Sequence, residues 1–129
     1  MGLSMCGITG LKKTTLNGKN TTLPIGAMAE VALNDNAANY DMLVARVRVR
    51  QSTVEDGVEY FMFHPTNYRT LTNHMQTVQH IEYASGGLKY VTISSKITSD
   101  KGLSFNTITN SEGFKESCII VVGVEGWKF

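Results

Sequence analysis

Apolar and polar residues alternate along most of this chain of 129 residues, a pattern that predicts strands with one buried face. Short alternating segments are separated by turn residues such as Asn34-Asp35-Asn36, Glu55-Asp56-Gly57 and Ser85-Gly86-Gly87. The segments that we expect to be strands are 8–16, 21–25, 27–33, 42–51, 58–64, 75–84 and 88–98. Short strands joined by hairpin turns predict an antiparallel meander.

The sequence shows no internal repeat and no composition shift, so we expect one domain with three parts. Residues 1–26 form an N-terminal hairpin, because Asn17-Gly18 between two threonine-rich segments is typical of a tight hairpin turn. Residues 27–99 form the antiparallel sheet. Residues 100–129 form a C-terminal segment.

The C-terminal segment carries two conflicting signals. Phe105 and Ile108, and then Phe114, Cys118 and Val122, recur at helical spacing. The β-branched run that follows Cys118 instead favours a strand. Because intrinsic propensity is easily overridden when a segment packs against a partner, we expect a helix. The predicted fold class is therefore α+β: an N-terminal β-hairpin, a five-stranded antiparallel sheet and a C-terminal helical segment.

Residues 42–51, which read MLVARVRVRQ, form the most informative stretch. Side chains alternate across a strand, so its apolar residues share one face; they are Leu43, Ala45, Val47 and Val49. Arg46, Arg48 and Arg50 share the other face, about 6.6 Å apart. Guanidinium groups at this spacing suit the phosphates of a single-stranded nucleic acid. The pattern also fits the solvent-exposed face of an ordinary amphipathic strand, and both interpretations stay open.

Residues 88–98 show a second strand with a mixed polar face. Val91, Ile93 and Ile97 are expected to face the core, and the opposite face then carries Tyr90, Thr92, Ser94 and Lys96. A tyrosine ring stacks on unpaired bases, and hydroxyl and ammonium groups contact phosphate or sugar. This interpretation gains strength if the two strands share a sheet face.

The residues that carry enzyme chemistry form no recognisable site. His64, His74 and His80 are irregularly spaced, without a carboxylate at metal-ligand spacing. No GxSxG motif, glycine-rich phosphate loop or paired-carboxylate pattern is present. Cys6 and Cys118 match neither a zinc site nor a CxxC pair, which leaves reduced thiols or an inter-subunit disulfide. We expect no enzyme, no cofactor, no metal and no small-molecule substrate.

Composition adds little more. Hydrophobic residues make up 42% of the chain, enough to build a core, and the net charge is +1. No stretch approaches the roughly 20 apolar residues that span a bilayer, and the N-terminus has no signal-peptide pattern. We therefore expect no membrane partner and a protein made in a cytoplasm. Residues 60–63 are apolar on both strand faces, which predicts cover on both sides, in a small domain often from a second subunit.

The segment 46–52, RVRVRQS, is followed by a short polar turn, a second β segment and Pro65. It resembles the central hairpin of the coat proteins of single-stranded RNA bacteriophages, the leviviruses. The layout is similar over most of the chain, with a hairpin, five strands and a C-terminal segment. The resemblance implies a dimer in which two five-stranded sheets join edge to edge. C-terminal helices packed on the dimer partner cover one sheet face, and the other face binds genomic RNA.

The resemblance, together with the polar face of 88–98, assigns two sets of residues. The RNA-binding set is Arg46, Arg48, Arg50, Glu59, Phe61, Tyr90, Thr92, Ser94 and Lys96. The dimer and assembly set is Phe105, Phe114, Ile119, Val122 and Trp127. The large apolar side chains at the C-terminus are costly to expose, and they suit an anchor in a partner groove.

We therefore expect the coat protein of a single-stranded RNA phage. It is expected to form homodimers that assemble into an icosahedral virion in the bacterial cytoplasm. Three rivals stay open: a cellular β-sheet module that binds RNA or another polyanion without forming a shell, a small β-barrel enzyme, and another phage structural protein such as a tail component.

Overall fold

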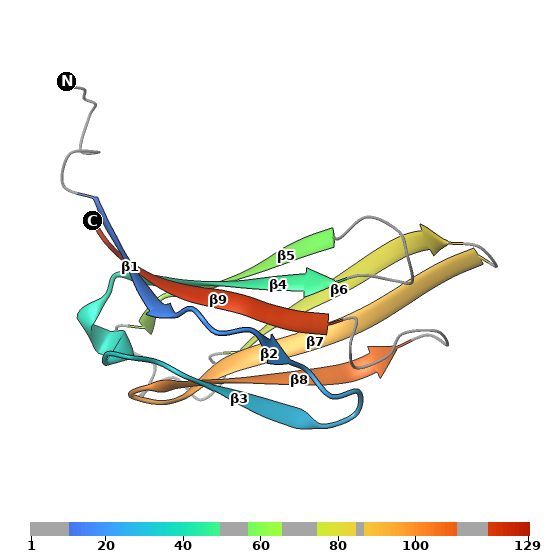
Figure 1. Ribbon diagram of the computed structural model, residues 1–129, viewed down its shortest axis with the longest axis horizontal. Helices are drawn as coiled ribbons and strands as arrows, with labels where there is room; N and C mark the ends of the chain where they lie inside the picture. Colours follow the sequence, from blue (N-terminus) through green and yellow to red (C-terminus); the bar gives the residue numbers. More distant parts are fainter. Residues whose placement is uncertain (1–10, 50–56, 66–74, 85–86, 111–118) are drawn as a thin grey trace, which may run out of the picture.

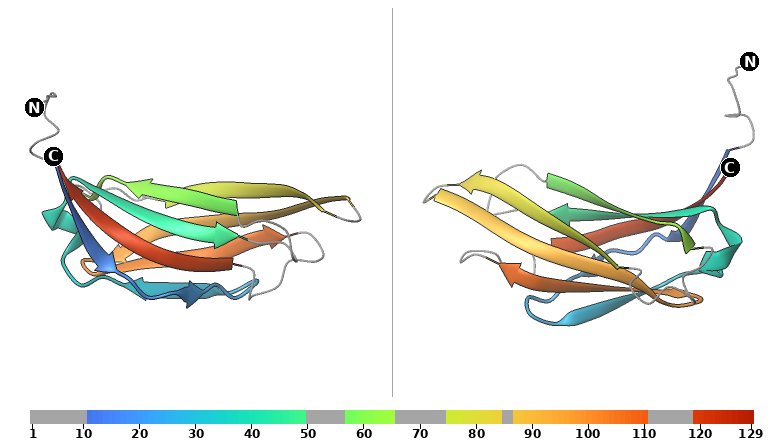
Figure 2. Two further views of the ribbon diagram at one scale, coloured as in Figure 1. Left: turned by 45° about the horizontal axis from the view of Figure 1, so that its top comes forward. Right: turned by 180° about the vertical axis from the view of Figure 1, so that it is seen from behind.

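Alternating burial along the strands folds the chain into two antiparallel sheets that pack face to face in the computed structural model (Figures 1 and 2). The structure describes residues 11–49, 57–65, 75–84, 87–110 and 119–129. Sheet A has the order β1-β9-β4-β5, with β2 also paired to β9, and sheet B has the order β3-β8-β7-β6. The strands are β1 (Lys12–Asn17), β2 (Thr21–Thr22), β3 (Met28–Ala32), β4 (Met42–Val49), β5 (Gly57–Phe63), β6 (Met75–Ala84), β7 (Gly87–Ser99), β8 (Gly102–Asn110) and β9 (Ile119–Lys128).

The predicted faces of β4 are confirmed. Its four apolar residues are buried, and they are Leu43, Ala45, Val47 and Val49. Arg46 is exposed and Arg48 is half-buried on the opposite face. Period-two alternation is therefore sufficient to orient this strand, because a shift of one residue would place its valines in water.

The core lies between the two sheets, where the inward side chains of β4 and β5 meet those of β7 and β8. Phe61 of sheet A packs edge-on against Phe105 of sheet B, with ring centroids 5.6 Å apart and an angle of 88° between the ring planes. Both side chains are fully buried. This aromatic pair is the clearest single contact that joins the two sheets, and edge-to-face pairs stabilise beyond the burial of their area.

The predicted C-terminal helix, and with it the α+β fold class, is wrong. The segment supplies two strands, β8 and β9. β9 lies within sheet A, paired to β1 and β2 on one side and to β4 on the other. Alternating burial of Ile119 and Val121 follows the strand period. A strand with neighbours on both sides gains ladder hydrogen bonds along its whole length, so here β-branched propensity and tertiary pairing act together.

The predicted N-terminal hairpin is also wrong. β1 and β2 do not pair with each other, because both run antiparallel to β9 as two parts of one irregular strand. Asn17 occupies the interruption, donating from its side chain to the carbonyl of Ala32 at 2.7 Å and accepting from the amide of Lys19 at 2.8 Å. The Asn-Gly pair thus makes a local side-chain turn that ties the chain to β3.

The predicted single sheet over residues 27–99 divides between the two layers. The β4–β5 and β6–β7 hairpins form as expected, but they lie in different sheets. β6 and β7 are long strands, and in Figure 1 they extend past the ends of β4 and β9. The apolar side of sheet A is therefore covered by sheet B of the same chain, rather than by a neighbouring copy.

A cluster of polar contacts in the segment before β4 holds the Tyr40 ring against the C-terminal end of β9. The Asp35 carboxylate accepts from the Tyr40 hydroxyl at 3.0 Å and from the side-chain amide of Asn39 at 3.1 Å. Hydrogen bonds donated by the backbone amide of Asn36 and by the Tyr40 hydroxyl lower the pKa of Asp35. Burial and the nearby Asp35 carboxylate raise the pKa of Tyr40. A Cβ at Gly126 would lie 2.6 Å from the Tyr40 ring, so only glycine lets the ring pack on β9.

Candidate nucleic-acid interface

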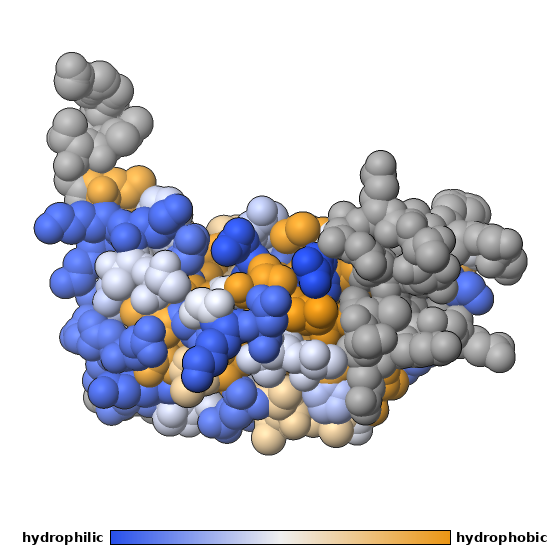
Figure 3. All heavy atoms as spheres, viewed as in Figure 1, coloured by the Kyte–Doolittle hydropathy of each residue, from blue (hydrophilic) through white to orange (hydrophobic). Residues whose placement is uncertain are grey.

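The outward side chains of sheet A form the candidate interface, which we call the arginine face. Strand register places Arg46 of β4 opposite Tyr60 of β5 on one side and opposite Gly123 of β9 on the other. Arg48 lies opposite Val58 and Ile120 in the next row. Figure 3 shows the result, with strongly hydrophilic and apolar side chains next to one another over β4 and β9.

The Arg46 side chain extends over Gly123 of β9. A Cβ at this glycine would lie 3.4 Å from Nη2 of Arg46, so the guanidinium lies above β9. A register shift in the pairing of β4 with β9 falls between Arg46 and Val47, at the same place; such bulges re-aim the side chains beside them. Among the described residues, the Arg46 guanidinium has no hydrogen-bond or ion-pair partner. Within the described part of the chain, nothing therefore competes with an anionic ligand for this guanidinium.

Exposed apolar side chains surround the arginines. Val58, Tyr60 and Met62 of β5 point outward, and Tyr60 is 54% exposed. The sequence predicted that residues 60–63 are covered on both faces, but within the described chain only the inward residues Phe61 and Phe63 are buried. Sequence reasoning missed Tyr60 as a site residue. The signal that would find it is the register of β5 against β4, which no local pattern supplies.

A third cation and a second aromatic ring lie at the far end of the arginine face. The Lys13 ammonium lies 5.7 Å from the ring centroid of Trp127 and 3.6 Å from a carboxylate oxygen of Glu125. The indole Nε1 of Trp127 is buried and has no hydrogen-bond partner among the described residues. Lys13 is half-exposed, so its contact with the ring stabilises the fold only weakly.

The two predicted RNA-binding strands do not share a face. Tyr90, Thr92, Ser94 and Lys96 point outward from β7 in sheet B, so they lie on the opposite side of the sandwich from Arg46. Thr92 accepts hydrogen bonds from the Thr109 hydroxyl at 3.0 Å and from the Gln79 amide at 3.3 Å. Ser94 is almost fully buried. These hydroxyls belong to a polar network on the sheet surface, and the structure does not join them to the arginines.

Phe61 and Glu59 lie away from the arginine face, because their parity on β5 turns them inward. Phe61 is in the core, where its ring has no surface to offer RNA. The Glu59 carboxylate lies 2.5 Å from Nδ1 of His80, a buried residue of β6. A Cβ at Gly57 would lie 2.2 Å from that imidazole, so the glycine leaves it room. This pair joins the adjoining edges of the two sheets.

The predicted assembly residues also differ from their expected places. Phe105 and Ile119 are fully buried in the core of a single chain, so neither is on a surface that a partner could contact. Val122 and Trp127 are half-buried on β9. Arg50, Phe114 and both cysteines lie outside the described residues.

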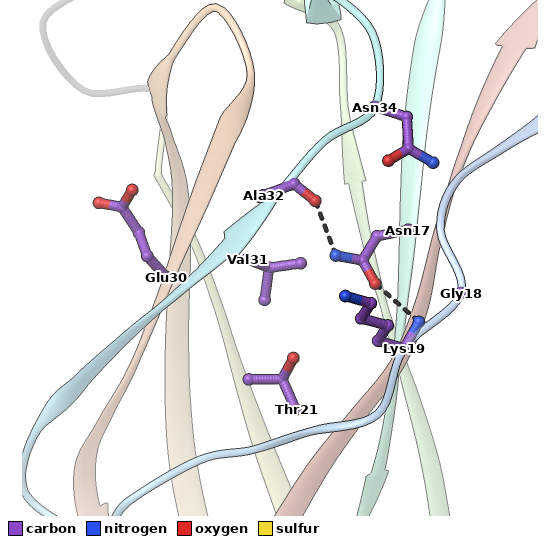
Figure 4. Close-up of a pocket in the computed structure, with 8 residues that line it drawn as sticks. All are labelled: Asn17, Gly18, Lys19, Thr21, Glu30, Val31, Ala32 and Asn34. Atoms are coloured by element: carbon purple, nitrogen blue, oxygen red, sulfur yellow. Dashed lines mark hydrogen bonds between the residues drawn. The ribbon is translucent and has the colours of Figure 1, made fainter.

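A polar hollow of about 330 Å³ opens where the β1–β2 connection meets β3 (Figure 4). Its lining residues are Asn17, Gly18, Lys19, Thr21, Glu30, Val31, Ala32 and Asn34. Both hydrogen-bonding groups of the Asn17 amide are used within the protein. The hollow is thus explained by the way this asparagine holds the irregular edge of the sandwich.

No model of a known protein family matches the chain, and no curated protein matches it in sequence. The likeness to levivirus coat proteins therefore rests on the segment 46–52, the turn, β segment and Pro65 that follow it, and the order of segments along the chain. Within the ranges that the structure describes, no three histidine, cysteine, aspartate or glutamate side chains group closely enough to hold a metal ion. No helix in that part of the chain is long and apolar enough to cross a membrane.

Proposed function

We propose that this protein binds RNA through the arginine face and packages it as the coat protein of an RNA-containing particle. The observation that carries the proposal is the Arg46 guanidinium over Gly123, beside Arg48 on a sheet face that no other described element covers. Guanidinium groups make strong, often bidentate hydrogen bonds to phosphate. Phosphate contacts supply most of the affinity in sequence-independent RNA binding.

The opposite side of the molecule supports the coat role. The outer face of sheet B exposes the large apolar side chains of Met28, Met75, Ile81 and Leu88. Exposed apolar side chains gathered on one face are typical of protein–protein contacts. A subunit that carries the arginines on one face and further exposed apolar side chains on the other is suited to hold RNA inside and to contact its own copies.

A second candidate is an RNA-binding module that does not assemble. Two observations favour it: the chain seals its own core, and side chains cap backbone groups at the sheet edges. The Gln76 side chain accepts from the Met62 amide at 2.9 Å, and Asn17 donates to the carbonyl of Ala32. Capped edges oppose the edge-to-edge dimer that the coat resemblance implied.

Particle formation distinguishes the two candidates. We expect the protein expressed in bacteria to elute at megadalton size, to appear as closed particles in electron micrographs, and to absorb at 260 nm because of enclosed RNA. A small species that binds added RNA would favour the module. A small species that neither carries RNA nor binds it would contradict both candidates.

A further inference from the structure

We infer that Tyr60 is a base-stacking platform and that the arginine face therefore selects RNA with unpaired nucleotides. This inference rests on the proposed function, because it names the class of RNA that the same face takes. The reasons are the position of the ring, the direction of the neighbouring arginine and a second aromatic group further along the face.

The Tyr60 ring lies at the rim of the arginine face, because β5 is an outer strand of sheet A. Tyr60 has no hydrogen bond, ion pair or ring contact among the described residues, and the residue is 54% exposed. Directly opposed residues of an antiparallel pair have Cα atoms about 4.5–5.5 Å apart. Tyr60 and Arg46 are such a pair, so a bound RNA strand that crosses β4 and β5 can reach both the ring and the guanidinium.

The Arg46 side chain leaves the ring open. Its guanidinium lies above Gly123 of β9, which is the strand on the other side of β4 from Tyr60. An arginine that stacked on Tyr60 would instead occupy the surface that a base needs. The bases of a duplex are already stacked on one another and cannot reach a flat sheet, so only unpaired bases can use this ring.

Trp127 lies further along the same face, and its fluorescence can report the binding of RNA. It is opposite Met42, which is four residues from Arg46 on β4, or about 13 Å along the strand. Lys13, which pairs with Glu125, brings a cation next to the Trp127 ring on that side. Because Trp127 is the only tryptophan in the chain, its fluorescence reports directly on whether a ligand reaches this end of the face.

The test compares three ligands and four variants. The ligands are a short oligouridylate, an RNA duplex and inorganic polyphosphate. Binding of each ligand is measured by Trp127 fluorescence and by fluorescence anisotropy. The variants are Tyr60→Ala, Tyr60→Thr, Tyr60→Phe and Ile81→Thr. Threonine keeps strand propensity at position 60, and phenylalanine keeps the ring. Ile81 is 52% exposed on β6, an outer strand of sheet B, which makes it a matched control away from the arginine face.

We expect Tyr60→Ala and Tyr60→Thr to weaken oligouridylate binding by about 5- to 150-fold, which corresponds to the loss of one stacked base. Polyphosphate binding should be unchanged, and Tyr60→Phe and Ile81→Thr should retain oligouridylate binding. The duplex should bind more weakly than the oligouridylate. If Tyr60→Thr binds oligouridylate as the wild type does, or loses polyphosphate equally, the stacking role is overturned while the arginine face stands. If no ligand binds the wild type, the proposed function fails as well.

Discussion

Replacing Arg46 and Arg48 together with threonine should weaken RNA binding by at least about tenfold, because two charge-assisted contacts to phosphate are lost. The same change should flatten the dependence of affinity on salt. Each phosphate that a protein neutralises on a single strand adds about 0.7 to the slope of log affinity against log salt concentration, so the slope should fall by about 1.4. Filter binding over a series of salt concentrations measures both quantities.

The matched control for this experiment is Lys96→Thr compared with Arg46→Thr alone. Each substitution removes one exposed cation from a strand inside a sheet, but Lys96 is on the outer face of sheet B. The Arg46 variant should lose affinity and slope, and the Lys96 variant should keep both. Equal losses would mean that net charge governs binding, with no role for the arginine face.

Phe61→Ala should destabilise the fold by about 3–5 kcal/mol, which is the usual cost of removing a large aromatic side chain from a packed core. Phe61 is fully buried and packs edge-on against Phe105, so the deletion leaves a cavity between the two sheets. Since small domains are stable by only about 5–15 kcal/mol, much of the total is lost. The midpoint of denaturant unfolding measures the change.

The neighbouring position provides the comparison for Phe61. Tyr60 is on the other face of the same strand and is half-exposed, so Tyr60→Ala should change the unfolding free energy by less than about 1 kcal/mol. The contradicting result is a Phe61→Ala variant that is as stable as the wild type but no longer binds RNA. It would show that Phe61, and not Tyr60, points outward from β5. The RNA-facing position that the coat resemblance gave to Phe61 would then be restored.

Local pattern was sufficient for most strands and for the faces of β4. The alternation of Leu43, Arg46 and Val49 depends only on neighbours along the chain, so the sequence indicates which side is buried. The β4–β5 and β6–β7 hairpins are likewise visible, because a turn signal joins two adjacent strand segments. These features are all set by short-range geometry.

Pairing between distant strands was not predictable in the same way. β9 pairs with β1, β2 and β4, and β3 pairs with β8; nothing in the local sequence specifies these partners. The helical spacing of Phe114, Cys118 and Val122 competed with the β-branched run that follows, and in β9 the run prevailed because that strand has neighbours on both sides. Propensity and long-range pairing together outweighed the apolar spacing.

The candidate site was predictable in part, for the same reason. The arginines were found because β4 alternates clearly. Residues 60–63 are apolar throughout, so their parity cannot be read from the pattern, and Tyr60 was missed in favour of Phe61. The separation of Arg46 from Tyr90 follows from the assignment of β4 and β7 to different sheets, which is a long-range property of the fold.

Ultraviolet crosslinking of bound RNA, followed by mass spectrometry of the crosslinked peptides, tests most directly whether RNA lies on the arginine face. We expect adducts within 42–49, 57–63 and 119–128, with Tyr60 as the main site. Adducts confined to Tyr90 and the rest of 87–99 would place RNA on the opposite sheet and contradict the account.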